Sequence, residues 1–187
     1  MKKIICLHGG PGSGKSTICA GLFYRLQING FNCEMNREYV KEWAWEGRNI
    51  HSGDQTYIFA KQSRGERMYI QQNVDFIITD SPLILTHFYG MLNDRYEREY
   101  NTSLMMLKNH HEYCKNNGYK TEHFLLKRNN ENYVQSGRYQ TKTEAQNIDT
   151  EIKKLLDELN IKYTNVLANE QAVDIIFSLL NINKGNL

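Results

Sequence analysis

The sequence contains little that would bind it to a membrane, or to nucleic acid by charge alone. Its 23 lysines and arginines stand against 21 aspartates and glutamates, so no strong basic field favours a nucleic-acid partner. The apolar run near the start, Ile4 to Leu7, is too short for a signal peptide or a membrane span. We therefore expect a cytoplasmic protein with no membrane partner.

Cysteine is scarce, and its spacing does not match a common metal or disulfide motif. Four cysteines occur without a C-x-x-C pattern: Cys6, Cys19, Cys33 and Cys114. Two of them lie in apolar patterns, so we expect reduced thiols in the core rather than disulfides or zinc ligands. Neighbouring side chains do not easily face one metal, and we interpret the pair His110-His111 as part of a solvated helix face.

The chain has no internal repeat, low-complexity tract or linker, and its length suits one domain spanning residues 1–187. Strand and helix patterns alternate, as in a parallel sheet covered by helices. Strands are expected at 3–8, 31–35, 74–80, 123–126 and 163–167, and helices at 15–29, 38–46, 54–72 and 83–117. Two further helices are expected after Thr141 and after Leu167. Capping-box spacing predicts helix starts at Ser52, before Gln55, and at Thr141, before Glu144.

The stretch GGPGSGKST at residues 9–17 matches the phosphate-binding pattern G-x-x-x-x-G-K-[ST]. Glycines let a loop wrap a triphosphate closely, and its N–H groups form an anion nest at the start of a helix. We expect Lys15 to bridge the β- and γ-phosphates and Ser16 to bind Mg²⁺. The expected nucleotide-binding residues are Gly9, Gly10, Pro11, Gly12, Ser13, Gly14, Lys15, Ser16 and Thr17. The fold class is therefore α/β, a nucleotide-kinase-like P-loop NTPase with a five-stranded parallel sheet, helices on both faces and a mobile lid.

Two carboxylates follow predicted strands and are candidates for chemistry. Asp80 ends an apolar strand, the position of a Walker B carboxylate that holds Mg²⁺. Ligands collect beyond the carboxyl ends of parallel strands, so Glu38 and Arg37, after the second strand, are expected near the γ-phosphate. Glu38 is then a candidate base for an attacking hydroxyl, and Arg37 a candidate contact to the acceptor. Alternatively, Asp80 caps a turn and Glu38 opens a surface helix.

The segment 127–142 differs in composition from the rest of the chain. Val134 is its only aliphatic residue, and it carries four basic residues against one acidic residue. Phosphoryl transfer requires positive groups that close over the phosphate and exclude water, so we interpret the segment as a lid with Arg128 and Arg138 as catalytic cations. The alternative is a solvated loop with scattered charge.

Two further groups of residues have open interpretations. Arg64 and Arg67 lie three residues apart on a predicted helix, where they either bind a charged group of the acceptor or form an exposed face. Trp43, Trp45 and Tyr57 either stack on a base or belong to the core.

Together these residues resemble the small P-loop kinases, in particular the ribosylnicotinamide kinase domain and the compact AAA-like proteins of phages. The matching stretches are GGPGSGKST, NREYVKE, FIITDSP and KRNNENYVQSGRYQTKTEAQNID. The resemblance implies an ATP–Mg²⁺ phosphotransferase with an acidic base after the second strand and arginines in a lid. The chain departs from it at Ser136-Gly137-Arg138, where ribosylnicotinamide kinases carry Asp-Gly-x-Arg.

A weaker resemblance links the chain to the kinase part of bacteriophage polynucleotide kinase. It rests on MKKII, on the P-loop and on Asn36-Arg37 followed by an acid, which is Glu38 here and aspartate in that family. We thus expect ATP-dependent transfer to the hydroxyl of a nucleoside- or nucleotide-like small molecule. The first alternative is a nucleic-acid kinase, whose positive footprint is faint here.

The second alternative is a non-catalytic nucleotide-binding switch. Neither a D-x-x-G motif after Asp80 nor an [NT]-K-x-D motif after the fourth strand is present. The acceptor and the oligomeric state stay open at this point.

Overall fold

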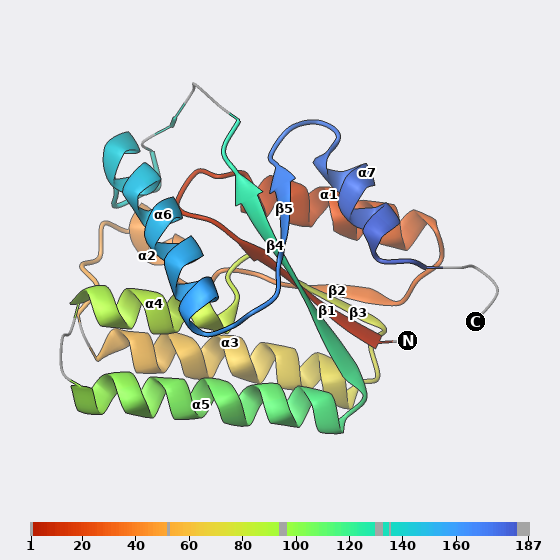
Figure 1. Ribbon diagram of the computed structural model, residues 1–187, viewed down its shortest axis with the longest axis horizontal. Coiled ribbons are helices and arrows are strands. Elements are labelled where there is room, and N and C mark those ends of the chain that lie inside the picture. Colours follow the sequence, from red (N-terminus) through yellow and green to blue (C-terminus); the bar gives the residue numbers. More distant parts are fainter. Residues whose placement is uncertain (1, 52, 94–96, 130–132, 135, 183–187) are drawn as a thin grey trace.

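A five-stranded parallel sheet forms the centre of the computed structural model, which describes all residues except 1, 52, 94–96, 130–132, 135 and 183–187 (Figure 1). The strands are β1 Lys2–His8, β2 Cys33–Asn36, β3 Phe76–Thr79, β4 Tyr119–Lys127 and β5 Thr164–Leu167. They are arranged in the order β2-β3-β1-β4-β5, and every neighbouring pair is parallel. The predicted α/β class with a five-stranded parallel sheet is confirmed.

Seven helices in the described part of the chain cover the sheet on both faces. They are α1 Lys15–Ile28, α2 Lys41–Trp45, α3 Asp54–Gln71, α4 Leu83–Asn93, α5 Glu97–Asn116, α6 Lys142–Glu158 and α7 Ala172–Leu179. Helices α1 and α7 lie on one face, and α3, α4 and α5 form a layer on the other (Figure 1). The helical region predicted at 83–117 is thus two helices, and the predicted 38–46 helix is shortened to α2.

The central strand β1 is buried on both faces, which is why its sequence is almost continuously apolar. Ile5 and Leu7 pack in the core beneath α1 and α7. Ile4 and Cys6 point to the opposite face, toward α3 and α5. Since parallel strands end at the same edge of a sheet, the loops after the five strands gather at one edge.

One predicted helix start is confirmed. Thr141 Oγ1 accepts a hydrogen bond from Glu144 N at 3.3 Å, and the Glu144 carboxylate accepts one from Thr141 N at 2.7 Å, so the capping box opens α6. Ser52, the other predicted cap, lies outside the described residues.

The four cysteines are free and buried, as expected. His110, however, does not belong to a solvated face: it is 5% exposed, and its Nε2 lies 2.7 Å from Glu66 Oε2. Helix α5 packs against α3 and covers this position, which the helical period alone does not reveal. None of the helices in the described ranges is long and apolar enough to cross a membrane.

Candidate active site

The P-loop runs from the end of β1 to the start of α1, at the edge of the sheet where the strands end. Its glycines are required by close packing. A Cβ on Gly10 would lie 2.7 Å from Ala145 O, and one on Gly12, whose φ is +72°, would lie 2.8 Å from the Tyr133 ring. Only glycine leaves the loop backbone this close to its neighbours.

The start of α1 presents donors suited to an anion. Its N-cap, Gly14, has no side-chain cap, and its first turn has no acidic residue, so neither competes for the free amide groups. Ser13 Oγ is buried without a hydrogen-bond partner within the described residues. This donor set fits a phosphate group.

Lys15 folds back onto the loop that precedes it. Its Nζ donates to Gly9 O at 2.7 Å and to Gly10 O at 2.9 Å. Burial lowers the pKa of Lys15, while the carboxylates of Glu38, Asp80 and Asp149 oppose that change. The lysine therefore sits among acidic groups, with its charge directed at the loop.

A clamp that sequence analysis missed fixes the P-loop. Asp149, on α6, accepts a hydrogen bond from Gly10 N at 2.5 Å through Oδ1 and one from Arg128 Nε at 2.9 Å through Oδ2. Arg128 Nη2 in turn donates to Pro11 O at 2.9 Å. We call Asp149 and Arg128 the P-loop clamp. The sequence contains one weak indication of this clamp: Asp149 is an acidic residue within a helix that follows the basic segment 127–142.

Arg128 is largely buried and hydrogen-bonded to the P-loop, whereas a residue of a mobile lid was expected at this position. It directly follows β4, its side chain is 9% exposed, and its Nη1 is buried without a partner in the described part of the chain. It therefore lies at the base of the 127–142 segment, against the P-loop.

Glu38 and Asp80 lie together because their strands are paired neighbours. Asn36 of β2 is in register with Thr79 of β3, so the residues that follow emerge side by side. Asp80 Oδ1 accepts a hydrogen bond from Glu38 N at 2.9 Å. Burial raises the pKa of Glu38, and Asp80 adds to this change while Lys15 opposes it.

A cavity of about 660 Å³ opens in front of the P-loop. The predicted site residues on its wall are Pro11, Gly12, Gly14, Lys15, Ser16, Thr17, Glu38 and Arg138. Gln55, Thr86 and Tyr89, which sequence analysis did not select, also line it. These three lie on α3 and α4, and only the packing of those helices brings them to the cavity.

Three predicted acceptor-binding arginines do not line this cavity. Arg37 is exposed next to buried Asn36, and Arg64 and Arg67 line a separate groove between α3 and α5. The Arg67 guanidinium lies 4.4 Å from the centroid of the Tyr113 ring on α5. Both arginines thus lie on an exposed helix face, because the opposite face of α3 carries the buried Ile58, Gln62 and Glu66.

The described part of the 127–142 segment rests on the region of α2. Tyr139 Oη donates to Arg48 O at 2.6 Å, and a Cβ on Gly137 would lie 2.7 Å from the Trp45 ring. Arg138 stands 5.2 Å from the centroid of the Tyr133 ring. Arg138 lies on the wall of the cavity, and residues 130–132 and 135 lie outside the described residues.

The two tryptophans have different surroundings. Trp43 is buried and stacks on Tyr57, with 6.2 Å between ring centroids and 9° between ring planes. Trp45 is 65% exposed and lies against Gly137. The core interpretation therefore holds for Trp43, and neither tryptophan lines the cavity.

The AAA_28 family model, described as AAA domain, matches residues 4–172. The chain belongs to this AAA domain family. A "Putative adenylate kinase" of Thermoplasma volcanium is 44% identical over 43 residues, which are 23% of this chain and 26% of that relative. The chain thus matches about a quarter of the length of this relative.

Solved structures extend the likeness to the whole fold. A deoxyadenosine kinase from M. mycoides with the products dCMP and dCDP has a TM-score of 0.57 at 14% identity, covering 97% of this chain and 99% of that one. The same enzyme with dATP has a TM-score of 0.53 at 15% identity, covering 97% and 100%. At these identities the likeness shows a shared fold, that of a small P-loop kinase.

Proposed function

We propose that this protein is a phosphotransferase that moves the γ-phosphate of ATP to a hydroxyl of a nucleoside- or nucleotide-like small molecule. One observation carries the proposal: Lys15 and Ser16 of the P-loop and the carboxylate of Glu38 line the same cavity. A site for phosphates and a candidate base for the acceptor therefore face one space. The kinase relatives and the shared fold support this interpretation.

The donor half of the site would use the P-loop. Its amide groups would surround the phosphates, and Lys15 would exchange its bonds to the loop carbonyls for bonds to phosphate oxygens. Ser16 and Asp80 offer a hydroxyl and a carboxylate, the oxygen ligands that Mg²⁺ prefers. When bound there, Mg²⁺ would neutralise charge on the phosphates.

The acceptor half would use Glu38 as general base. A base is most effective when its pKa lies near the working pH, and burial raises the pKa of Glu38 in that direction. Around it the cavity combines the polar side chains of Gln55 and Thr86 with the apolar ones of Ile58 and Leu85. This mixture and the volume of about 660 Å³ suit a nucleoside-sized acceptor.

We further propose that residues 127–142 act as a lid over the bound phosphates. Arg138 would meet charge that is largest in the transition state, whereas Arg128 would hold the P-loop through the clamp. Hydrogen exchange of residues 136–142 should slow when ATP and acceptor are both bound. Exchange that ignores both ligands would contradict the lid.

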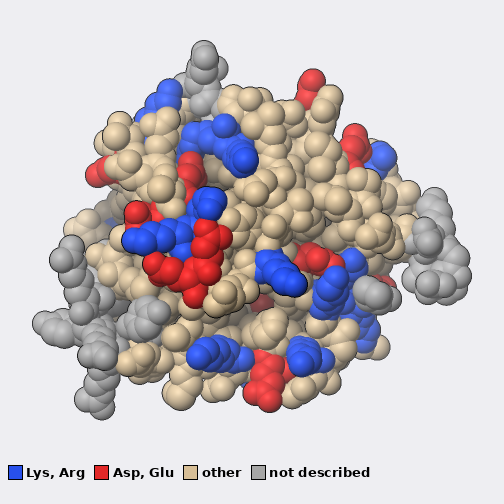
Figure 2. All heavy atoms as spheres, viewed as in Figure 1, with Lys and Arg blue, Asp and Glu red and all other residues tan. Residues whose placement is uncertain are grey.

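The alternative function is a nucleic-acid kinase, which would transfer the same phosphate to a hydroxyl of DNA or RNA. Figure 2 shows one face of the molecule, and basic and acidic side chains are interspersed on it instead of forming a continuous basic track. A surface that follows a phosphate backbone would need such a track. The small-molecule acceptor is therefore the proposal, and the oligonucleotide is a test condition.

The test is a transfer assay with γ-labelled ATP across nucleosides, nucleotides, ribosylnicotinamide, oligonucleotides and hydroxymethylated DNA. We expect label on one class of small molecule, and no label above background with the Lys15→Ala variant. Transfer to oligonucleotides alone would favour the nucleic-acid kinase. Tight ATP binding with no transfer to any acceptor would favour the non-catalytic switch.

A further inference from the structure

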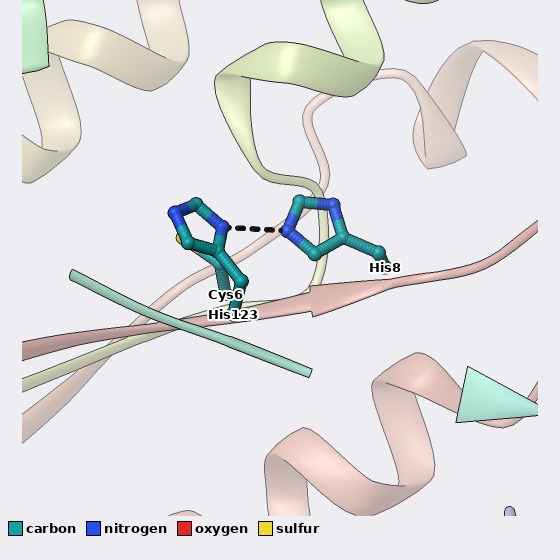
Figure 3. Close-up of side chains that lie close together, drawn as sticks. All are labelled: Cys6, His8 and His123. Atoms are coloured by element: carbon teal, nitrogen blue, oxygen red, sulfur yellow. Dashed lines mark hydrogen bonds between the residues drawn. The ribbon is translucent and has the colours of Figure 1, made fainter. Parts of the chain in front are cut away.

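A second group of reactive side chains lies beneath the P-loop and takes no part in the proposed transfer. It consists of Cys6 and His8 on β1 and His123 on β4 (Figure 3). Cys6 and His123 are register partners across the two strands, and His8 lies two residues further along the same face of β1. We call these three residues the Cys–His–His cluster.

The three side chains converge on one point. His8 Nε2 and His123 Nδ1 face each other at 2.8 Å, and Figure 3 shows Cys6 behind the His123 ring. Each residue offers one ligand atom, and these atoms all lie within 4.8 Å of one another. Because they stand on paired strands in the middle of the sheet, their backbone positions are fixed by the ladder.

Cys6 and His8 are buried, and His123 is partly buried. His8 is fully buried, and its Nδ1 has no hydrogen-bond partner within the described residues. Burial lowers the pKa of His8 well below its usual range and that of His123 to about 4, so both rings are neutral at neutral pH. Neutral imidazole is the form that binds metal ions.

A purely structural histidine pair explains these observations less completely. The hydrogen bond between the rings uses one nitrogen of each, yet it leaves a buried nitrogen of His8 unpaired and a thiol beside the pair. Imidazole nitrogen and thiolate sulfur are, in contrast, the donor types that bind Zn²⁺, and three such ligands leave a fourth position open. His123 is only partly buried and gives a path for entry.

We propose that Cys6, His8 and His123 form a binding site for one zinc-class divalent transition-metal ion. On binding, the Cys6 thiol loses its proton to solvent, the hydrogen bond between the imidazoles breaks, and each imidazole keeps one N–H on the ring nitrogen that does not bind the metal. A fourth position remains for water. Since His8 directly precedes Gly9, the ion would stabilise the strand end from which the P-loop starts.

A neighbouring cluster serves as the internal control. Glu66, His110 and Cys114 also lie close together between α3 and α5, and all three are buried. There, Glu66 Oε2 and His110 Nε2 form a 2.7 Å hydrogen bond that joins the two helices. His110 Nδ1 is also buried without a hydrogen-bond partner in the described residues. All three residues of this second cluster are buried, however, whereas His123 is only partly buried and gives a path for entry, so the Cys–His–His cluster is the favoured site.

The experiment titrates the untagged, chelator-treated chain with Co²⁺ under a non-thiol reductant and then displaces it with Zn²⁺. We expect one equivalent of metal, a thiolate-to-cobalt charge-transfer band, and protection against thermal unfolding by Zn²⁺. Cys6→Ser should abolish the band, and His123→Asn should weaken Co²⁺ binding at least about tenfold. The matched control Cys114→Ser should keep both the band and the affinity.

Because His123 is partly exposed, His123→Asn keeps the test decisive if Cys6→Ser fails to fold. Absence of stoichiometric binding in the parent chain would overturn the proposal. So would a His123→Asn variant that binds Co²⁺ as tightly as the parent. Loss of the band in Cys114→Ser with its retention in Cys6→Ser would assign the metal to the cluster between α3 and α5 instead.

Discussion

The helical layers on the two faces of the sheet differ in what they bury. The layer of α1 and α7 packs aliphatic and aromatic side chains around Leu22, Leu26 and Ile176, which are fully buried. The layer of α3, α4 and α5 buries polar groups that are bonded to one another, such as Thr86 Oγ1, which donates to Gln62 Oε1 at 2.8 Å. The first layer is a support for the P-loop, and the second brings polar groups toward the cavity.

This difference follows from the geometry of the site. Helix α1 must hold the loop at its N-terminus without moving, and an apolar interface packed at high density provides that rigidity. The other layer faces the acceptor half of the cavity, where hydrogen-bonding groups are needed. Substitutions of apolar residues in the α1 and α7 layer should therefore lower stability, whereas substitutions of residues that line the cavity should lower the transfer rate.

The largest effect is expected for the pair Lys15→Ala and Leu22→Ala, both on α1. Lys15→Ala should lower transfer by about 10³-fold or more with little change in stability, because it removes the positive charge proposed to meet the phosphates. Leu22→Ala should lower the free energy of unfolding by about 3 kcal/mol, since it leaves a cavity in the apolar layer, and keep the rate per folded molecule. Denaturant titration measures the stability of the two variants, and transfer assays measure their rates. Equal changes in stability and in rate for Lys15→Ala and Leu22→Ala would contradict the separation of the two roles.

The P-loop clamp links α6 to the P-loop and should affect both stability and ATP binding. Asp149→Ala leaves Arg128 and Gly10 N without their shared acceptor, so we expect a loss of about 2–3 kcal/mol in stability and roughly 5–10 °C in Tm. ATP should also bind more weakly. Asp157→Ala removes an exposed carboxylate of the same helix and should change stability by less than about 0.5 kcal/mol. Equal losses in both variants would show that the clamp adds nothing to an ordinary surface pair.

The ionised carboxylate of Glu38, which we propose as the general base, should lower the stability of the folded chain at neutral pH. Its pKa is raised in the folded state, so the folded chain holds this proton more tightly than the unfolded chain, and ionised Glu38 destabilises the fold as pH rises above the ordinary glutamate pKa of about 4.3. Glu38→Gln should therefore have a higher Tm than the parent at pH 7, and the difference should shrink below pH 4. A Tm difference that does not depend on pH would contradict the raised pKa of Glu38.

The smallest effect is expected for the groove between α3 and α5. Arg67→Ala should change the transfer rate by less than about twofold, because Arg67 stacks on Tyr113 outside the cavity. Arg138→Ala, which removes a charge on the cavity wall, should lower the rate by roughly 10–100-fold. Initial rates at saturating ATP compare the two. Equal losses would show that the groove contributes to the acceptor site.

Much of the fold could be predicted because its signals are local. The P-loop pattern, the apolar strands and the capping box at Thr141 each lie within a few consecutive residues, and their order implies a parallel sheet. The positions of Glu38 and Asp80 followed from the rule that strand ends meet at one edge, and the structure brings these two residues into contact.

The remaining features depend on contacts between distant segments. Asp149 reaches Gly10 only because α6 packs over the loop, and His123 meets His8 only because β4 is paired with β1 in one register. His110 was assigned to solvent because a helical period identifies faces but not the neighbour that covers them. Such contacts depend on how helices and strands pack together, and a pattern within a few consecutive residues does not predict that packing.

The most direct test of the central claim compares phosphate transfer by the parent chain and Glu38→Gln to the acceptor that the labelled-ATP assay identifies. Calorimetry should give ATP–Mg²⁺ affinities within about threefold of each other, because Lys15, Ser16 and Asp80 remain. Single-turnover transfer should fall by about 10²-fold or more, since the proton of the attacking hydroxyl loses its acceptor. Transfer at the parental rate would contradict the account and leave Asp80 as the carboxylate beside the phosphates.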